Sequence, residues 1–400
     1  MEKFLRKPVA LLLAAWLGLR LLTSLAAAAF SSLRPLSPLE QALPAWPPAA
    51  NLGRWLERVL AAPWLRWDAH WYARIVSAGY AAGDGTTNFH PLYAWLSTPL
   101  ARLGLDPIAS LLLTGSLATL GLLFVFLHLA RLDLEPVPAW TALLALVTFP
   151  AAVVLFAPYA EGLFLLLAAL ALLLSRRGRP LAAGLAACLA ALTHQLGVFL
   201  ALPLAWQAWE AAGRSVRGLG RAWRALLAAL AAPLGLAAWS AFRLFGLHEG
   251  RLDPSSLQAL VYSALISPSA HRVVPLQAFV WPWQAASLIA VKLAQHPDAD
   301  ILVDLALGLA FLAALALAWR YLRPADRLYT AAVTLVSFCY STGPVHPTMG
   351  LPRHLLAALP VFIGLGAALK RAWQRRLLLA VGLAGLILLT LLYVLEAWVP

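Results

Sequence analysis

The chain has 400 residues, of which 62% are hydrophobic and only 12% are charged, and its mean hydropathy is +0.79. Soluble domains contain about 45–50% apolar and about 25% charged residues, so this composition excludes a soluble globular enzyme, and disorder is excluded by the high hydrophobicity. The net charge is +13, from 30 basic and 17 acidic residues. In a membrane protein such an excess first indicates orientation, because short cytoplasmic loops collect Lys and Arg, and no nucleic-acid partner is expected.

Apolar runs follow one another along the chain and predict an all-α polytopic membrane protein. The first run, 8–30, is too long for the core of a signal peptide and is expected to remain as an uncleaved helix. The run 181–206 is interrupted at Thr193-His194-Gln195 and predicts two short helices, because both of its flanks are rich in Arg. About ten or eleven membrane helices in a single domain, 1–400, are expected. The remaining runs are 107–130, 137–157, 162–175, 225–245, 301–319, 328–340, 354–369 and 377–394.

Two long mixed segments separate these runs, at 31–99 and 246–300. The first is too polar to span a membrane and rich in aromatic residues, so it predicts a large outer loop with short amphipathic helices. Eighteen of the thirty basic residues gather in the other connections and at the start of the chain. The N-terminus is therefore predicted to be cytoplasmic and both long segments extracytoplasmic. The basic clusters lie at 3–7, 131, 176–179, 214–224, 320–327 and 370–376.

The first long segment contains the densest group of polar and aromatic residues. An acid flanked by tryptophans at a membrane interface suits a sugar-binding site, because aromatic faces pack on sugar rings and a carboxylate accepts a hydroxyl proton. An interfacial aromatic belt with an ion-paired Asp is the alternative explanation. The group consists of Arg66-Trp67-Asp68, His70-Trp71-Tyr72, Gly79-Tyr80 and Phe89-His90-Pro91-Leu92-Tyr93.

These motifs resemble the first outer loop of the PIG-V family, which comprises the second mannosyltransferase of GPI-anchor synthesis and its bacterial relatives. Later motifs resemble that family in the same order along the chain. His90, His194 and His354 stand where the family has Phe, Arg and Tyr, and Ala94 replaces a Pro, whereas Asp68, Glu161 and Arg353 match. The later motifs are Tyr159-Ala160-Glu161-Gly162-Leu163-Phe164, Thr193-His194-Gln195-Leu196-Gly197 and Pro352-Arg353-His354.

The resemblance implies a GT-C-like bundle and an inverting glycosyltransferase that uses a polyprenyl-phosphate-sugar, with mannose as the implied sugar. Asp68 would be the general base that deprotonates the acceptor hydroxyl, and Arg353 with His354 would bind the donor phosphate. The acceptor is a lipid, a glycan or a protein. The remaining expected substrate-binding residues are Trp67, Trp71, Tyr72, Tyr80, His90, Glu161 and His194.

Three of these residues also have a simpler, purely structural explanation. Arg353 is equally explained as an Arg at a helix end with its head in water, and Glu161 by compensation of a helix dipole. His194 is explained by hydrogen bonding to backbone freed at a helix break. No cofactor is expected. A divalent metal at Asp68, His70 and His90 is the weaker alternative, because the three are widely spaced in the chain.

Other classes of membrane protein compete with this interpretation. Protein mannosyltransferases and aminoarabinose transferases carry an adjacent Asp-Glu pair in the first outer loop, and this chain has no such dipeptide. A lipid flippase or solute transporter would show repeated halves and paired intramembrane charges, and the sequence shows neither. Four lysines against 26 arginines, with abundant Ala and Leu, indicate a GC-rich bacterial genome. The expected location is therefore the bacterial plasma membrane, with the active site outside.

Overall fold

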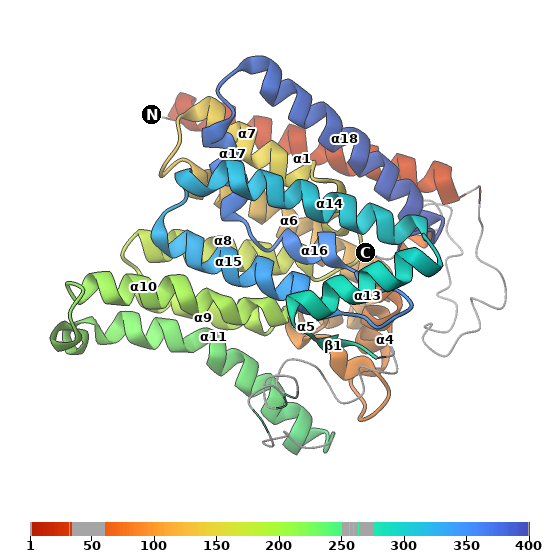
Figure 1. Ribbon diagram of the computed structural model, residues 1–400, viewed down its shortest axis with the longest axis horizontal. Coiled ribbons are helices and arrows are strands. Elements are labelled where there is room, and N and C mark those ends of the chain that lie inside the picture. The colour runs from red at the N-terminus through yellow and green to blue at the C-terminus, as the bar shows by residue number, and fades with distance from the viewer. Residues whose placement is uncertain are drawn as a thin grey trace.

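A computed structural model describes residues 2–31, 33, 61–249, 256, 259, 263, 276–398 and 400. These residues form an all-α bundle whose helices run roughly along one common direction, with one short two-stranded ribbon (Figure 1). The fold class predicted from the apolar runs is thereby confirmed.

The helices of the bundle begin where the sequence supplies a start signal. Proline occupies the first position of many of them, where its missing N–H has no partner to lose. Asp106 precedes one such start and accepts a hydrogen bond from the backbone N–H of Ile108 at 2.8 Å. The α-helices of the bundle are α1 (Glu2–Ser31), α6 (Pro107–Ala130), α7 (Pro136–Val147), α8 (Glu161–Arg176), α9 (Pro180–Ala191), α10 (Ala201–Ala211), α11 (Trp223–Ala241), α14 (Ala299–Ala318), α15 (Pro324–Cys339), α17 (Pro360–Ala368) and α18 (Ala372–Val394).

Five segments of the described chain are long and apolar enough to cross a membrane, so the protein is a multi-pass membrane protein. The other predicted spans are built from shorter pieces. The run 137–157 is α7 followed by the 3-10 helix η3 (Pro150–Leu155), and the run 354–369 is divided between α16 (Leu351–Leu355) and α17. The five segments are Val9–Ser31, Pro107–Ala130, Val216–Gly246, Ala299–Tyr321 and Ala372–Val394.

The predicted break within 181–206 lies where the sequence placed it. Helix α9 ends at Ala191, and the 3-10 helix η4 (Gln195–Leu200) leads into α10 after it. The connection from α10 to α11 contains a further 3-10 helix, η5 (Val216–Ala222). A π-helix, η6 (Phe242–Gly246), ends α11, and the 3-10 helix η8 (Trp319–Tyr321) ends α14.

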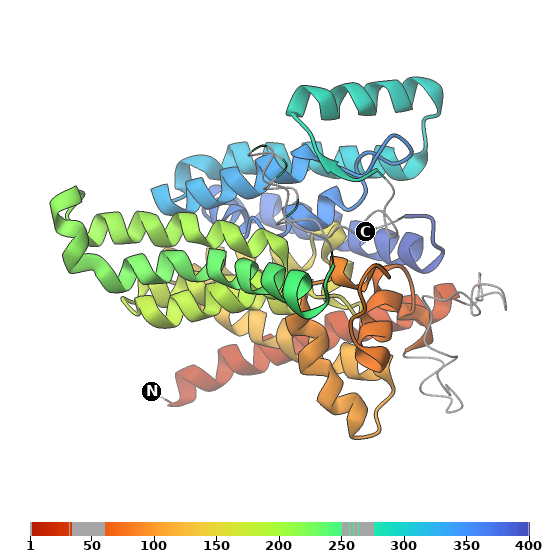
Figure 2. The same ribbon diagram turned by 90° about the horizontal axis from the view of Figure 1, so that it is seen from below.

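Short helices occur in the described parts of both long segments. The first contains η1 (Ala62–Trp64), α4 (Asp68–Ala78), η2 (Thr86–Asn88) and α5 (Pro91–Arg102), which extends past the predicted limit of residue 99. The second contains β1 (Ala278–Phe279) and α13 (Pro282–Gln295), which lies on the outside of the bundle (Figure 2). Strand β1 pairs antiparallel with β2 (Tyr340–Ser341), directly after α15. Residues 34–60 and most of 250–275, where the rest of these loops was predicted, lie outside the described residues.

The two ends of the bundle differ in character. At one end, ion pairs join the turn after α6, the end of α8 and the start of α15, with Arg176 at 2.6 Å from Asp133 and paired also with Asp326. Arg323 pairs with the same Asp133. Helices α4, α5 and α13 lie at the opposite end (Figure 1). The candidate site is at that second end.

Candidate active site

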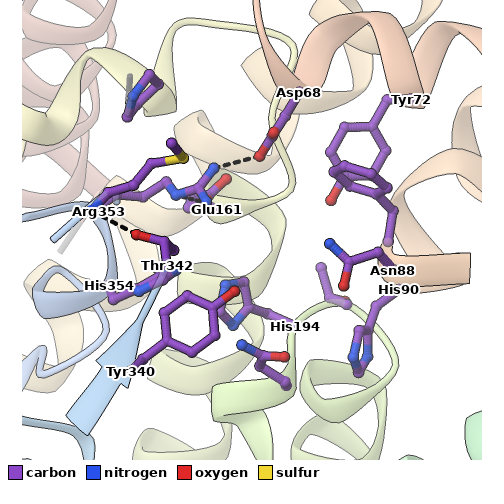
Figure 3. Close-up of a pocket in the computed structure, with 15 residues that line it drawn as sticks. Asp68, Tyr72, Asn88, His90, Glu161, His194, Tyr340, Thr342, Arg353 and His354 are labelled. Atoms are coloured by element: carbon purple, nitrogen blue, oxygen red, sulfur yellow. Dashed lines mark hydrogen bonds and ion pairs between the residues drawn. The ribbon is translucent and has the colours of Figure 1, made fainter. Parts of the chain in front are cut away.

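A cavity of about 100 Å³ lies between α4, the end of η2 and the residues before α5, the start of α8, the α9–η4 break, β2 with the loop after it, and α16. A single water needs roughly 10–15 Å³ by the same measure, so the cavity holds several water-sized groups. Of the expected site residues, the structure brings seven into its lining. They are Asp68, Tyr72, His90, Glu161, His194, Arg353 and His354 (Figure 3).

Asp68 is the first residue of α4, and the turn before it fixes its position. Trp67 has a φ of 51°, a conformation that costs a non-glycine residue roughly 1–3 kcal/mol and therefore needs support. That support comes from the end of α18, where the hydroxyl of Tyr393 donates to the carbonyls of Trp64 and Arg66 at 3.1 and 3.2 Å. The backbone N–H of Asp68 in turn donates to the hydroxyl of Tyr159 at 3.2 Å.

Arg353 lies between the two acids of the cavity. Its Nη1 is 2.5 Å from Oδ2 of Asp68, and its Nε is 3.4 Å from Oε1 of Glu161. The guanidinium carbon is 5.5 Å from the ring centroid of Tyr159, within the range of a cation–π contact. Burial alone would lower the pKa of Arg353, but Asp68 and Glu161 together raise it above its ordinary value. The side chain therefore stays a cation in this largely buried position.

Glu161 is almost completely buried at the first position of α8. Burial raises the pKa of its carboxyl to about 7, an effect that Arg353 opposes and Asp68 reinforces. The following residue is a glycine, and a Cβ on Gly162 would lie 2.6 Å from Oγ1 of Thr119 on α6, so a larger residue would have to displace that side chain. The close approach of α6 and α8 thus sets the position of Glu161.

The neutral wall of the cavity contains histidines. His90, which precedes α5, has Nδ1 at 2.7 Å from the carbonyl oxygen of Ala191. His194 stacks on Phe164 at 4.9 Å and meets His354 edge-on at 5.9 Å. Burial lowers the pKa of His90 to about 4, so its ring is neutral at physiological pH.

Three of the expected substrate-binding residues lie outside the cavity lining. Trp71 stacks on Phe89 at 5.9 Å, and Tyr80 meets Trp239 edge-on at 5.1 Å while its hydroxyl donates to the carbonyl of Phe89. Trp67 is half-buried in the strained turn before α4. These aromatic residues pack around the site, whereas Tyr72, four positions after Asp68, shares its helix face and reaches the cavity.

The cavity also contains residues that sequence reasoning did not select. Tyr340 and Thr342 enter through β2 and the loop after it, and Asn88 through η2. That loop is held to α14 by the buried carboxylate of Asp304, which accepts from Nε1 of Trp398 at 2.8 Å and from Thr348 at 3.2 Å. No motif marked Tyr340, which ends an ordinary apolar run.

Among the described residues, no group of three or more His, Cys, Asp or Glu side chains is arranged to hold a metal ion. Asp68 instead pairs with Arg353, and His90 contacts a backbone carbonyl. The cavity therefore combines two acids, a largely buried guanidinium and neutral hydrogen-bonding groups at one end of a membrane bundle. This set can accept a proton, bind an anion and recognise hydroxyl groups.

Comparison with known proteins identifies the class as a membrane glycosyltransferase. The chain belongs to glycosyltransferase family 87, whose model matches residues 89–342. His90, Glu161 and His194 lie within the matched part, whereas Asp68 and Arg353 lie outside it. The expectation of a glycosyltransferase is thereby confirmed, and the narrower resemblance to the PIG-V family stays a prediction. No curated protein matches the chain.

Two crystal structures of the oligosaccharyltransferase of Archaeoglobus fulgidus are similar to this chain. The apo form has a TM-score of 0.45, and the form tethered by a disulfide to an acceptor peptide with an NVT sequon has 0.43. Both are 12% identical over 96% of this chain and 56% of theirs, so the chain spans about half the length of those proteins.

Proposed function

We propose that this protein is an inverting glycosyltransferase that transfers a hexose from a polyprenyl-phosphate-sugar to an extracytoplasmic acceptor. Membership of glycosyltransferase family 87 supports the reaction class. Mannose is proposed as the sugar from the motif resemblance, and the acceptor is a lipid, a glycan or a protein. The proposed location is the bacterial plasma membrane, with the N-terminus in the cytoplasm and the cavity outside.

The observation that carries this proposal is the contact between Asp68 and Arg353. The two residues are 285 positions apart in the chain, yet Nη1 and Oδ2 lie 2.5 Å apart at the edge of a cavity. A largely buried guanidinium needs an anionic partner, and a donor phosphate offers one in the same geometry as a carboxylate. Binding of the donor phosphate to Arg353 would release Asp68 from its ion pair.

The released carboxylate then acts as the general base. The acceptor oxygen forms a bond to the anomeric carbon as its proton passes to Asp68. The bond from that carbon to the phosphate oxygen breaks on the opposite face, so the configuration inverts. The electron pair stays on the phosphate, which leaves as polyprenyl phosphate and gains charge that Arg353 stabilises. No separate acid is required for this leaving group.

The first prediction tests Asp68 directly. Purified protein in lipid vesicles with polyprenyl-phosphate-mannose and acceptor lipid extract is expected to release polyprenyl phosphate, and Asp68→Asn to reduce the rate by about 10²–10⁴-fold. Asp84→Asn is the matched control. Asp84 forms an ion pair with Arg74 at 2.9 Å in the same loop but lies outside the cavity lining.

Two outcomes would contradict this assignment. If Asp68→Asn transfers sugar at the wild-type rate, Asp68 is not the base. If the wild type releases no polyprenyl phosphate but moves the intact lipid across the vesicle membrane, the protein is a flippase or transporter instead. Equal thermal unfolding midpoints for the two variants would show that any loss of rate is not a loss of folding.

A further inference from the structure

The break between α9 and η4 leaves backbone groups without helical partners. The side chains of two histidines, His90 and His194, contact these groups at hydrogen-bond distance. The carbonyl oxygen of Ala191, at the end of α9, is 2.7 Å from Nδ1 of His90. The N–H of Leu196, at the start of η4, donates to Nδ1 of His194 at 3.1 Å. A helix end normally leaves several such groups without an intrahelical partner, and these contacts satisfy two of them.

The first contact fixes the proton on the ring of His90. A carbonyl oxygen only accepts hydrogen bonds, so Nδ1 of His90 must carry the hydrogen. Because burial lowers the pKa of this imidazole to about 4, the ring holds no second proton at neutral pH. Its Nε2 is therefore a hydrogen-bond acceptor.

The second contact fixes the opposite tautomer on His194. A backbone N–H only donates, so Nδ1 of His194 must be unprotonated, and the single hydrogen of the neutral ring resides on Nε2. His194 thus presents a donor where His90 presents an acceptor. No protein partner of either Nε2 atom is found in the described part of the chain.

Both rings line the same cavity, and they lie away from its charged groups. Asp68, Glu161 and Arg353 are the charged residues among those that line it, and they lie together in the upper part of Figure 3. His90, His194 and Asn88 occupy the lower part of the same view. The cavity therefore has a charged side suited to phosphate and proton transfer, and a neutral side suited to hydroxyl groups.

We propose that His90 and His194 form a fixed acceptor–donor pair that recognises two hydroxyl groups of the donor sugar and makes the site selective for a neutral hexose. This inference rests on the proposed function and concerns its substrate specificity. One sugar hydroxyl donates to Nε2 of His90, and another accepts from Nε2–H of His194. The lone pair of His90 repels a carboxylate, so a uronic acid in place of the hexose binds poorly.

A His→Asn substitution separates the proposed contact from the structural one. In His90→Asn the side-chain amide N–H can still donate to Ala191, and in His194→Asn the side-chain oxygen can still accept from Leu196, as Asn does at helix starts. Both variants lack Nε2, the ring nitrogen that the backbone contact leaves available. His128→Asn is the matched control, because Nδ1 of His128 lies 2.7 Å from the carbonyl of Phe124 on the exposed end of α6.

The experiment measures transfer and binding of polyprenyl-phosphate-hexose and of donors lacking one hydroxyl at a time. His90→Asn and His194→Asn are each expected to reduce kcat/KM for the complete hexose by about 10- to 100-fold, the range for losing one buried hydrogen bond and leaving its partner unpaired. Each variant should also lose the discrimination against one particular deoxy donor that the wild type shows. His128→Asn should match the wild type in both respects.

The outcomes separate this inference from the proposed function. Retention of wild-type discrimination against every deoxy donor by both variants overturns the histidine pair while leaving the transferase intact. If the wild type binds the donor without transferring sugar, the proposed function fails, and the ratio of dissociation constants for complete and deoxy donors still tests the pair. If no donor binds to the wild type, both proposals are overturned.

Discussion

Glu161 and Asp68 are both within reach of one guanidinium, yet their surroundings differ. The side chain of Glu161 is 6% exposed, whereas that of Asp68, which also lines the cavity, is 25% exposed. Burial raises the pKa of Glu161 to about 7, with Arg353 opposing this effect. Paired carboxylates in unlike environments take unlike roles, and this difference favours Asp68 as the group that meets the acceptor.

The pKa of Glu161 makes folding stability depend on pH. Its folded-state value of about 7 lies above the roughly 4.3 of an unfolded glutamate, so the folded protein binds a proton more tightly. The protonated carboxyl of Glu161 therefore stabilises the folded state. This stabilisation is fully present below about pH 4.3 and is lost as the pH rises through about 7. Glu161→Gln should remove up to about 3 kcal/mol of the change in the free energy of unfolding over this pH range. The measurement is the thermal unfolding midpoint in detergent at pH 5 and pH 8.

Comparison between variants isolates this carboxyl from other titrating groups. Glu135, the exposed residue before α7, provides the control Glu135→Gln, which should keep the wild-type change between the two pH values. Buried histidines such as His90 give a slope of opposite sign at acidic pH, and they are common to all three proteins. Identical changes in midpoint for the wild type and Glu161→Gln would refute the assignment.

The motifs in the sequence included the three charged residues that line the cavity. Asp68, Glu161 and Arg353 come from three separate motifs, and the structure joins them through the ion pairs of Arg353. The same motifs were less informative about aromatic residues, because a motif does not say which side chains share a helix face. Trp71 and Tyr80 accordingly pack beside the cavity instead of lining it.

At the scale of elements, the break between α9 and η4 determines the neutral side of the site. Gly197 lies in η4, folded back against the end of α9. A Cβ at this position would lie 2.5 Å from the backbone nitrogen of Ala191 and 2.7 Å from the carbonyl oxygen of Ala190. Backbone atoms yield less than flexible side chains, so only glycine allows this close approach.

Gly197→Ala is therefore expected to displace the end of α9 and with it both histidine contacts. The cost should be about 1–3 kcal/mol of folding stability, as for other overpacked positions, and kcat/KM should fall with it. Thermal unfolding and sugar-transfer assays of the purified variant test this expectation. Gly220→Ala in η5 is the control, because nothing lies within 4 Å of its added Cβ. Equal midpoints for the two variants would show that the break tolerates a side chain.

Hydrophobic runs predicted the helices well, because a helix that spans a membrane needs an apolar stretch of sufficient length. The interrupted run at 193–195 even indicated the break that the structure contains. Pairing of β1 with β2 was beyond such reasoning, since each strand has only two residues and the paired residues are 61 and 63 positions apart in the chain. Tyr340 reaches the cavity through that pairing, which explains why no local pattern identified it.

On the scale of the whole molecule, the two ends of the bundle differ in charge. The Arg-rich turns lie at the end opposite to α4 and α5, and α1 begins at that same end (Figure 1). There Asp133 and Asp326 neutralise only part of the positive charge, through Arg176 and Arg323. An uncompensated basic end is typical of the cytoplasmic side, so the cavity end should face outward.

Labelling of single cysteines tests this orientation. Cys188 and Cys339, both half-buried, are first replaced by Ala. In intact bacterial cells, a membrane-impermeant maleimide is expected to label Ala82→Cys, which is exposed in the loop after α4, and not Arg217→Cys, which is exposed in η5. Arg217→Cys should react only after lysis, because its turn would lie in the cytoplasm. Labelling of Arg217→Cys alone in intact cells would place the cavity inside, where a cytoplasmic donor would have to replace the extracytoplasmic one.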